Sequence, residues 1–353
     1  MKALVLAGGK GTRLRPITHT SAKQLIPVAN KPILFYGLEA IRDAGITTVG
    51  LVVGETGDEI REAVGDGSGW DLDVTYIPQS EPLGLAHAVI VARDFLGEDD
   101  FVMYLGDNLL VEGLGGFVEE FRKSPSNAQI FLAAVPEPER FGVAVLEGDR
   151  VVRLEEKPRE HISDLALAGV YIFDRTIHEA VRSVRPSWRG ELEITDSIQH
   201  LIDRGHSIRA ELISGWWKDT GKMEDLLEAN RIMLSRLEHR VEGEVDGESN
   251  VVGPVVVEPG AKITRSTVLG PAIIGEDTIV EDSTVGAYAS IYFGCEVRTS
   301  QIEDSIIMER CRIDGVEGLG RSLLGKDVGV RRGRRRPAMY RVMLGDQSQV
   351  EVL

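Results

Sequence analysis

The stretch LVLAGGKGTRL, residues 4–14, passes from an apolar strand-like run into closely spaced glycines. The stretch matches neither the dinucleotide-binding pattern G-x-G-x-x-G nor a P-loop, because no Gly-Lys-Ser/Thr closes a four-residue spacer. Glycines at Gly8, Gly9 and Gly11 let backbone amides approach a phosphate chain, and the planar guanidinium of Arg13 can hold it. The stretch therefore predicts a β-strand followed by an anion-binding turn. A tight turn without a ligand is the alternative.

The same alternation of short β-branched runs and helical-period segments continues to residue 240. It is typical of βαβ units in a mostly parallel sheet, so we predict an α/β domain. Strands are expected at Lys2–Ala7, Thr48–Val53, Val74–Pro78, Phe101–Leu105, Gln129–Val135 and Gly169–Phe173. Covering helices are expected at Pro32–Asp43, Leu85–Phe95, Phe117–Arg122 and Lys222–His239, and a hairpin at Val143–Leu146 with Val151–Leu154.

The pattern changes after Glu242, where helical periodicity disappears and a bulky apolar residue followed by glycine recurs. Examples are Val252-Gly253, Leu269-Gly270, Ile274-Gly275, Val285-Gly286, Phe293-Gly294 and Leu324-Gly325. Spacings near multiples of six suggest hexapeptide-type coils of a parallel β-helix, each burying its apolar face against its neighbours. We predict two domains, 1–240 and 241–353, the second a left-handed parallel β-helix. A small β-sandwich or barrel is the alternative.

Composition narrows the classes of partner. The net charge of −16 argues against a broad nucleic-acid surface. No apolar run is long enough to span a membrane, and residues 1–14 lack the h-region of a signal peptide, so a cytoplasmic protein is expected.

Cys295 and Cys311 show no metal spacing and are expected to be buried thiols. The arginine-rich stretch 331–336 is interpreted as a solvated face, with binding to an anionic partner as the alternative.

A longer series of motifs accompanies the glycine turn. The series consists of SAKQLIPV (21–28), NKP (30–32), QSEPLGLA (79–86), LGDN (105–108), RFGV (140–143), EEKP (155–158), RGELEITD (189–196) and WKDTG (217–221). In this order it resembles the sugar-1-phosphate nucleotidylyltransferases, and within them the glucose-1-phosphate thymidylyltransferases. The tail makes the chain similar to their long forms. The resemblance implies a Rossmann-like nucleotidyltransferase domain that makes dTDP-glucose and pyrophosphate from dTTP and α-D-glucose 1-phosphate, for deoxysugar synthesis.

The resemblance also implies which residues act. Those expected at the nucleotide are Gly8, Gly9, Gly11, Thr12, Arg13, Lys23, Gln24, Gln79, Gly84 and Asp107. Those expected at the sugar phosphate are Asn108, Gly142, Glu156, Lys157, Gly169 and Arg189. Catalytic roles fall to Arg13, Lys23, Asp107, Lys157 and Asp219. Phe141 stands where the family often has Tyr, which removes a hydroxyl from the expected sugar pocket.

The chemistry of the implied reaction supports two of these assignments. Attack of one anion on another requires charge neutralisation, which carboxylate-bound Mg²⁺ can supply. Asp107 follows an apolar run and should lie at the carboxyl end of a strand, where α/β sheets bind ligands. Asp219 is the expected second ligand. The sugar phosphate, with a second pKa of about 6, is largely dianionic at neutral pH and needs no general base, so no catalytic histidine is expected.

Several alternatives stay open. Asp107 and Asp219 could be helix N-caps, Glu156 and Lys157 a solvated pair, and Arg189 a surface partner of the glutamates that follow it. The enzyme could use UTP or N-acetylglucosamine 1-phosphate, or the chain could be a non-catalytic regulatory homologue. We expect no nucleic-acid or membrane partner. The tail is expected to be structural and to support oligomerisation or regulation. A homo-oligomer is expected, and trimers through the tail and tetramers through the first domain both stay open.

Overall fold

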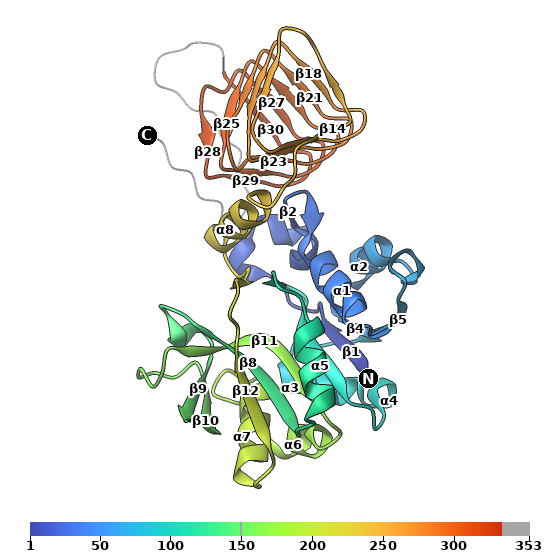
Figure 1. Ribbon diagram of the computed structural model, residues 1–353, viewed down its shortest axis with the longest axis vertical. Coiled ribbons are helices and arrows are strands. Elements are labelled where there is room, and N and C mark those ends of the chain that lie inside the picture. The colour runs from blue at the N-terminus through green and yellow to red at the C-terminus, as the bar shows by residue number, and fades with distance from the viewer. Residues whose placement is uncertain (149, 334–353) are drawn as a thin grey trace. The chain divides into compact units, whose positions relative to one another are not determined.

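The computed structural model describes residues 1–148 and 150–333, and Figure 1 shows its elements. These residues form two compact units. The first consists of Met1–Lys10, Ala22–Leu25 and Ile33–Asp219, and the second of Gly11–Ser21, Ile26–Pro32 and the chain from Thr220 on. The division differs from the predicted domains 1–240 and 241–353, which remain a prediction from sequence pattern. No helix among the described residues is both long and apolar enough to cross a membrane.

A nine-stranded sheet forms the centre of the first unit. Its strands, in order across the sheet, are β5 (Asp73–Pro78), β4 (Thr48–Val53), β1 (Lys2–Leu6), β6 (Phe101–Leu105), β11 (Leu165–Phe173), β8 (Ala128–Ala134), β12 (Ile208–Leu212), β10 (Arg150–Glu156) and β9 (Gly142–Glu147). The part β5-β4-β1-β6 is parallel, as predicted. In the other part only β8 and β12 run parallel, and the remaining pairs are antiparallel. The tight β9–β10 turn accounts for one of these pairs, because short connections join antiparallel neighbours.

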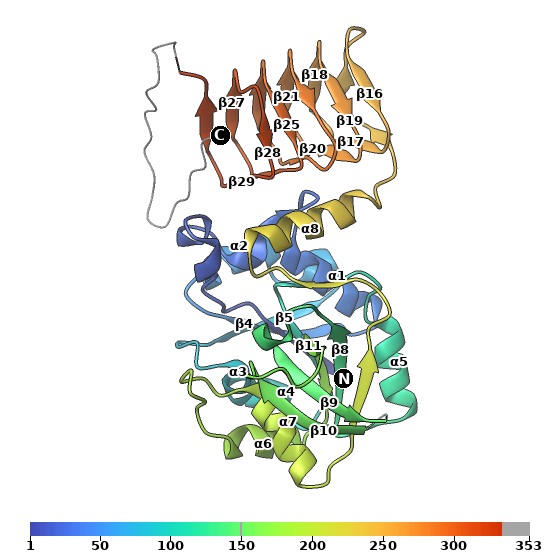
Figure 2. The same cartoon turned by 90° about the vertical axis from the view of Figure 1, so that its left-hand side faces the viewer.

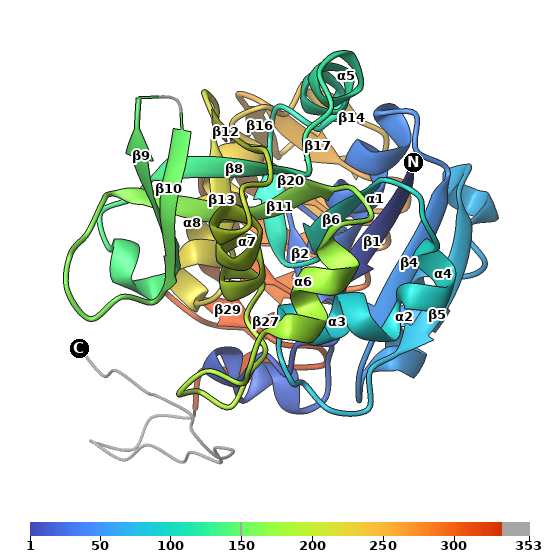
Figure 3. The same ribbon diagram turned by 90° about the horizontal axis from the view of Figure 1, so that it is seen from below.

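Helices cover both faces of this sheet. The helices of the first face are α1 (Ile33–Asp43), α2 (Gly57–Val64) and α5 (Gly115–Lys123), and those of the second are α3 (Leu85–Val91), α4 (Arg93–Leu96), α6 (Ile177–Ser183) and α7 (Ile194–Asp203). Ala3 and Val5 of β1 face the first group while Leu4 faces the second, as the two-residue period of a strand requires. Figure 3 shows α3, α6 and α7 together on one side of the strands. The predicted helix 85–95 is thus two helices, α3 and α4.

The order of the parallel strands creates a ligand position. The chain goes from β1 to β4 on one side and later returns to β6 on the other side of β1. A crevice at the carboxyl ends of the strands is expected where the order reverses in this way. The residues that follow β1 and β6 therefore lie at the expected binding edge.

The second unit begins with short elements. They are the 3₁₀ turns η1 (Thr12–Leu14) and η2 (Ile17–His19), the strands β2 (Pro27–Val28) and β3 (Lys31–Pro32), and helix α8 (Met223–Leu234). Helix α8 is shorter than the predicted 222–239. Leu237, which prolongs the helical period in the sequence, instead packs from a turn against Leu234, Val256 and Ile273.

Three parallel sheets follow, which we call the solenoid (Arg240–Arg331). The first holds β14 (Arg240–Val241), β17 (Val255–Val257), β20 (Ala272–Ile274), β23 (Ser290–Ile291), β26 (Ile306–Ile307) and β29 (Leu323–Leu324). The second holds β15 (Glu244–Val245), β18 (Lys262–Thr264), β21 (Ile279–Glu281), β24 (Glu296–Arg298), β27 (Arg312–Asp314) and β30 (Gly329–Arg331). The third holds β16 (Asn250–Val252), β19 (Thr267–Leu269), β22 (Thr284–Val285), β25 (Gln301–Glu303) and β28 (Leu319–Gly320). Figure 2 shows strands of successive coils side by side, an arrangement consistent with a β-helix.

The solenoid interior is apolar, and it contains both cysteines as buried free thiols, as predicted. Of the arginine-rich stretch, Arg331 and Arg332 are exposed, and residues 334–336 lie outside the described residues.

A ladder of serines connects the coils at one corner. The hydroxyl of Ser283 donates to the carbonyl of Glu281 at 2.7 Å and accepts the backbone N–H of Ser300 at 3.0 Å, 17 residues further on. Ser266 and Ser300 repeat both bonds in the neighbouring coils. Each hydroxyl therefore satisfies a backbone group that the turn leaves without a sheet partner.

We predict that Ser283→Ala lowers the free energy of unfolding by about 1–3 kcal/mol, because the buried N–H of Ser300 loses its acceptor. Urea unfolding followed by circular dichroism measures the change. Thr284→Ala, at the adjacent half-exposed position, is the control and should cost less than about 1 kcal/mol. Equal losses in the two variants would contradict a role for the ladder.

Candidate active site

Glycines let three parts of the first unit meet at the carboxyl ends of β1 and β6. A Cβ at Gly106 would lie 3.0 Å from the carbonyl oxygen of Leu6, and one at Gly54 would lie 2.9 Å from that of Gly8. Substitution by any other residue would force these backbones apart. The packing therefore requires glycine at 54 and 106, whereas a Cβ on Gly8 would meet its nearest neighbours at 3.4 Å, and the role of Gly8 toward phosphate stays a prediction.

Three charged side chains meet beside this edge. The ammonium of Lys23 donates a hydrogen bond to Oδ2 of Asp107 and lies 3.9 Å from Oδ1 of Asp219. Asp107 directly follows β6, and Asp219 arrives through the two-stranded pairing of β7 (Asn108–Leu110) with β13 (Trp217–Asp219). That pairing sets Asp219 opposite Asn108. Asp107 is followed by strand β7, and the N-cap of the helix after Asp219 is Lys222, so the N-cap alternative is wrong.

Lys23 keeps Asp107 ionised. Burial alone would raise the pKa of this carboxyl, but the charge and hydrogen bond of Lys23, with a further bond from Asn108, outweigh burial and hold it below its ordinary value. Nδ2 of Asn108 donates to Oδ1 of Asp107 at 3.0 Å, and its own Oδ1 accepts the Trp217 indole N–H at 2.7 Å. Asp107 is therefore a fixed anion.

The donor set suits a divalent cation. Asp107 and Asp219 already converge on one positive group, the Lys23 ammonium. Mg²⁺ typically takes one or two protein carboxylates and completes its octahedron with phosphate oxygens and water. Within residues 1–148 and 150–333, no three His, Cys, Asp or Glu side chains gather in a metal-binding arrangement.

Two glutamines lie beside the glycine turn. Gln24 is buried, and its Oε1 has no hydrogen-bond partner within the described part of the chain. Nε2 of Gln79 lies 3.0 Å from Nδ1 of His87, and its Oε1 would be 3.4 Å from a Cβ on Gly8. Gly84 has a φ of +107°, and a Cβ there would lie 2.4 Å from the carbonyl oxygen of Leu192, so no other residue fits. These groups offer amide donors and acceptors at one place.

A second cluster of charges surrounds Glu156 at the end of β10. Oε2 of Glu156 accepts the hydroxyl of Thr195 at 2.7 Å, and its Oε1 lies 3.4 Å from Arg189 and 3.8 Å from Lys157. Glu156 is 18% exposed, so the pair with Lys157 is not simply solvated. Arg189 also bonds the glutamates that follow it, Glu191 and Glu193. Two of these three carboxylate partners of Arg189 are thus the following glutamates of the surface-partner interpretation, and the third is Glu156.

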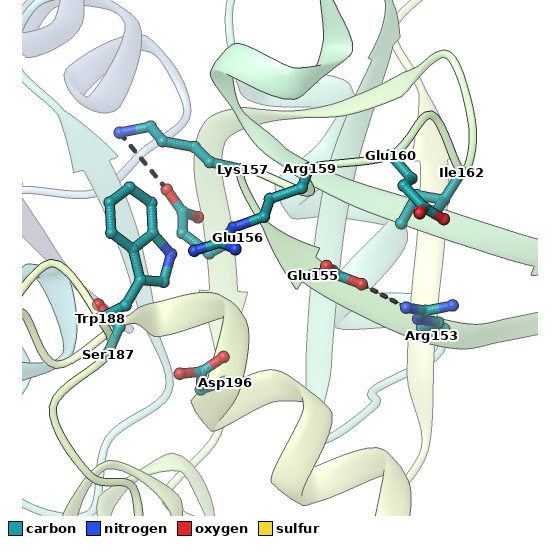
Figure 4. A pocket seen from close by; sticks show the side chains of 10 residues that line it. All are labelled: Arg153, Glu155, Glu156, Lys157, Arg159, Glu160, Ile162, Ser187, Trp188 and Asp196. Carbon is teal, nitrogen blue, oxygen red and sulfur yellow. Dashed lines mark hydrogen bonds and ion pairs between the residues drawn. The ribbon is translucent and has the colours of Figure 1, made fainter.

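Glu156 and Lys157 of this cluster line a pocket of about 580 Å³. The lining residues, drawn in Figure 4, are Arg153, Glu155, Glu156, Lys157, Arg159, Glu160, Ile162, Ser187, Trp188 and Asp196. Burial, reinforced by the charge of Glu156, raises the pKa of Asp196. Cations and carboxylates thus alternate around the space, which suits a polar ligand that carries both an anionic group and hydroxyls.

Close approaches at two glycines shape the floor of this region. A Cβ at Gly142 would lie 3.0 Å from Oε2 of Glu156 and 2.9 Å from Cγ2 of Thr195. Gly169 has a φ of +67°, sits at the bulge of β11, and a Cβ there would lie 2.9 Å from Oδ1 of Asn108. Both expected sugar-site glycines are therefore required by their surroundings.

Comparison with known proteins agrees with these arrangements. A family profile described as "Nucleotidyl transferase" matches residues 2–236. The chain is 56% identical over 353 residues to a glucose-1-phosphate thymidylyltransferase of Streptomyces griseus, covering 100% of this chain and 99% of the relative. A glucose-1-phosphate thymidylyltransferase of Streptomyces antibioticus is also 56% identical, over 355 residues with the same coverage. The chain belongs to the nucleotidyl transferase family, in its glucose-1-phosphate thymidylyltransferase branch.

A solved structure supports the same family. A Bacillus anthracis protein assigned as a glucose-1-phosphate thymidylyltransferase and solved with sucrose superposes with a TM-score of 0.62 at 36% identity. The match covers 66% of this chain and 94% of that one. The resemblance drawn from the motifs is thereby confirmed at the level of the family.

The remaining predicted residues of this family's signature belong to the second unit. Gly11 has a φ of +59° and precedes η1, which contains Thr12 and Arg13. A Cβ at Gly221 would lie 2.8 Å from a guanidinium nitrogen of Arg13, so the glycine of the WKDTG motif leaves room for this arginine. Sequence reasoning missed Thr195, which holds Glu156, although it lies inside the quoted RGELEITD motif.

We predict that Lys23→Met destabilises the protein mainly near neutral pH. In the wild type, the pKa of Asp107 is lower in the folded chain than in the unfolded chain, where it is about 3.9. This difference stabilises the fold at pH values above the unfolded pKa, and the stabilisation is lost as the pH falls through the folded pKa. Without Lys23, burial dominates and ionised Asp107 becomes unfavourable. Because the aspartates are partly exposed, we expect a loss of about 1–3 kcal/mol at pH 7, shrinking as the pH approaches 4.

Urea unfolding at pH 7 and pH 4 measures this difference. Lys10→Met removes an exposed pair with Glu55 and should change stability by less than about 1 kcal/mol at both pH values. A loss for Lys23→Met that does not depend on pH would mean that the lysine acts by packing alone.

Proposed function

We propose that this protein transfers a thymidylyl group from dTTP to α-D-glucose 1-phosphate and releases pyrophosphate. An oxygen of the sugar phosphate bonds to the α-phosphorus, and the bond between the α-phosphorus and the bridging oxygen to the β-phosphate breaks in line. Pyrophosphate leaves with that electron pair. One observation carries the reaction type: Asp107 and Asp219 converge on Lys23 at the binding edge of the sheet. The names of the full-length relatives support the substrates.

The residues around β1 would hold the nucleotide. Backbone amides at Gly8, Gly9, Gly11 and Thr12 would approach the triphosphate, with Arg13 and Lys23 as its cationic partners. Gln79 and the backbone of Gly84 would bind the thymine edge. Oε1 of Gln24 is buried and accepts no hydrogen bond from residues 1–148 or 150–333, and a donor on the bound nucleotide would satisfy it.

The residues around β10 would hold the sugar phosphate. Lys157 and Arg189 would bind its phosphate, and Glu156, oriented by Thr195, would accept hydrogen bonds from glucose hydroxyls. Gly142, Gly169 and Asn108 would shape the pocket. The nucleophile is already an anion at pH 7, so the residues orient it and neutralise charge, which is where most of the rate enhancement of such a reaction arises.

Asp107 and Asp219 would bind Mg²⁺. When bound, the ion would neutralise phosphate charge and fix the geometry of the reacting groups. We further propose that the product enters deoxysugar synthesis, as in antibiotic pathways, and that the reaction takes place in the cytoplasm.

A grid of nucleotides and sugar phosphates tests the proposal. Each of dTTP, UTP, GTP, ATP and CTP is combined with the 1-phosphates of glucose, galactose, mannose and N-acetylglucosamine in the presence of Mg²⁺. We predict that pyrophosphate is released fastest from the combination of dTTP and glucose 1-phosphate. Chelation of the metal should abolish turnover, and Asp107→Asn should lower kcat by at least about 100-fold, because a carboxylate that serves the transition state is removed.

Each outcome has a distinct meaning. A maximum with UTP or N-acetylglucosamine 1-phosphate would keep the chemistry and change the substrates. If the folded protein released no pyrophosphate with any combination of substrates, the result would favour a non-catalytic homologue. Near-normal turnover of Asp107→Asn would contradict the metal assignment.

We also propose that the solenoid is a left-handed parallel β-helix and supports a homo-oligomer. Val252 and Leu269 are neighbours on adjacent strands, 48% and 41% exposed, and form an apolar column on its outer surface. We take this exposed pair as the candidate contact with a second copy of the chain.

Light scattering at defined protein concentration should therefore report a mass that is a multiple of 38.7 kDa. Val252→Asp together with Leu269→Asp should lower that mass if the column is the interface. An unchanged mass would place the interface elsewhere, and a monomeric wild type would contradict the oligomer.

A further inference from the structure

A strained turn begins five residues after Gln24, at Ala29. The hairpin β2–β3 is closed by Ala29 and Asn30, whose φ angles are 47° and 57°. Two residues in this left-handed region make a type I′ turn, for which asparagine and glycine are preferred. Alanine gains nothing from this conformation, because its Cβ crowds the following carbonyl. Such strain persists only where the surroundings enforce it.

Asn230 of α8 holds the turn in this conformation. Its Oδ1 accepts the N–H of Ala29 at 2.8 Å, and its Nδ2 donates to the carbonyl of Tyr288 in the solenoid at 3.1 Å. Asn230 is 1% exposed. One buried amide therefore connects the turn to a coil of the solenoid, and all of these residues belong to the second unit.

Further contacts tie the same turn to the solenoid. Nδ2 of Asn30 donates to the carbonyl of Ile291 at 2.8 Å, and Ala29 packs against the apolar cluster that includes Leu234 and Ile273. Figure 1 shows β2 and α8 next to the solenoid sheets within this unit. On the other side of the lysine segment, a Cβ at Gly325 would lie 3.6 Å from Cγ1 of Ile17.

The segment between these anchors carries two site residues. Residues 11–21 and 26–32 belong to the unit that contains the solenoid, whereas Ala22–Leu25, with Lys23 and Gln24, belongs to the sheet unit. Both ends of this four-residue segment are thus covalently attached to parts that the solenoid unit holds. The clamped turn at 29–30 is thus joined to Lys23 and Gln24 by only a few residues of chain.

We propose that the solenoid acts in nucleotidyl transfer as a scaffold for this segment, and that Asn230 is the positioning residue that transmits the constraint. The inference rests on the proposed function. It assigns the C-terminal part of the chain a role in nucleotide alignment in addition to any role in assembly. Asn230 touches no substrate group itself and acts through the backbone of Ala29.

Three variants separate positioning from simple stability. Asn230→Ala removes both hydrogen bonds. Asn230→Asp keeps an acceptor for the N–H of Ala29 but cannot donate to Tyr288, and it buries a carboxylate, so it should be at least as unstable as Asn230→Ala. Arg231→Ala is the matched control, because Arg231 pairs with Asp304 of the solenoid from the adjacent position of α8 without reaching the turn.

Steady-state kinetics of dTDP-glucose formation and thermal melting are measured on each full-length protein. We expect kcat of Asn230→Ala to fall about tenfold, less than the roughly 100-fold that a 1 Å misplacement can cost. The KM for dTTP should rise, and the KM for glucose 1-phosphate should stay within twofold, roughly the scatter expected for an uncoupled site. Asn230→Asp should recover most of kcat despite its lower melting temperature, and Arg231→Ala should keep wild-type kinetics.

Activity that simply follows the melting temperature across the three variants would overturn the inference, as would wild-type kcat in Asn230→Ala. Should Asn230→Ala fail to fold, Asn30→Ala takes its place, because it removes only the hydrogen bond from the turn to the carbonyl of Ile291. A lower kcat and a higher KM for dTTP, with the KM for glucose 1-phosphate within twofold, support positioning, and wild-type kinetics refute it. A wild-type chain that forms no dTDP-glucose would overturn the proposed function, a result that the wild-type reaction alone reveals before any variant is compared.

Discussion

The close placement of two carboxylates and one ammonium constrains the whole sheet unit. Like charges such as those of Asp107 and Asp219 repel at short range, and Lys23 offsets that repulsion by contacting both. The arrangement needs three chain segments at one strand edge: the end of β6, the end of β13, and the turn η3 (Lys23–Leu25). Glycines at the strand ends, such as Gly106, allow the backbones to approach closely enough.

The second cluster is arranged in a similar way, but a carboxylate takes the central place that the Lys23 ammonium has in the first. Around Glu156 a single carboxylate is met by Arg189, Lys157 and a hydroxyl donor. One cluster thus presents anions held by a cation, and the other presents cations held by anions. In both clusters, charges of opposite sign pair with one another within the same group of residues. This pairing offsets the free-energy cost of keeping the charges partly buried in the folded chain.

Much of this could be predicted from sequence, and the limits are physical. The strands β4 and β6 match their predicted bounds because their apolar runs are continuous and flanked by turn residues. Asp107 could be placed because a strand end is a local feature. The pairing of β7 with β13 could not, since strands of three residues carry no periodic signal and their register is set by contacts distant in sequence. The role of Thr195 depends likewise on the approach of α7 to β10.

The assignment of residues 11–21 and 26–32 to the solenoid unit was equally invisible in the sequence. The contacts of Ala29 and Asn30 reach residues 201 and 261 positions away, and no local pattern announces them. A two-residue turn with Ala29 in the left-handed region is a poor choice on local propensity. Local and global preferences usually agree in natural proteins, so a conflict marks a place where tertiary structure imposes the conformation. Here the imposing groups are Asn230 and the carbonyl of Ile291. The solenoid owes its own rigidity to repetition, since each coil satisfies its neighbour's backbone through the sheets and the serine ladder. A rigid repeat that holds a strained turn is therefore the means by which the C-terminal part of the chain can act on chemistry carried by its first 25 residues.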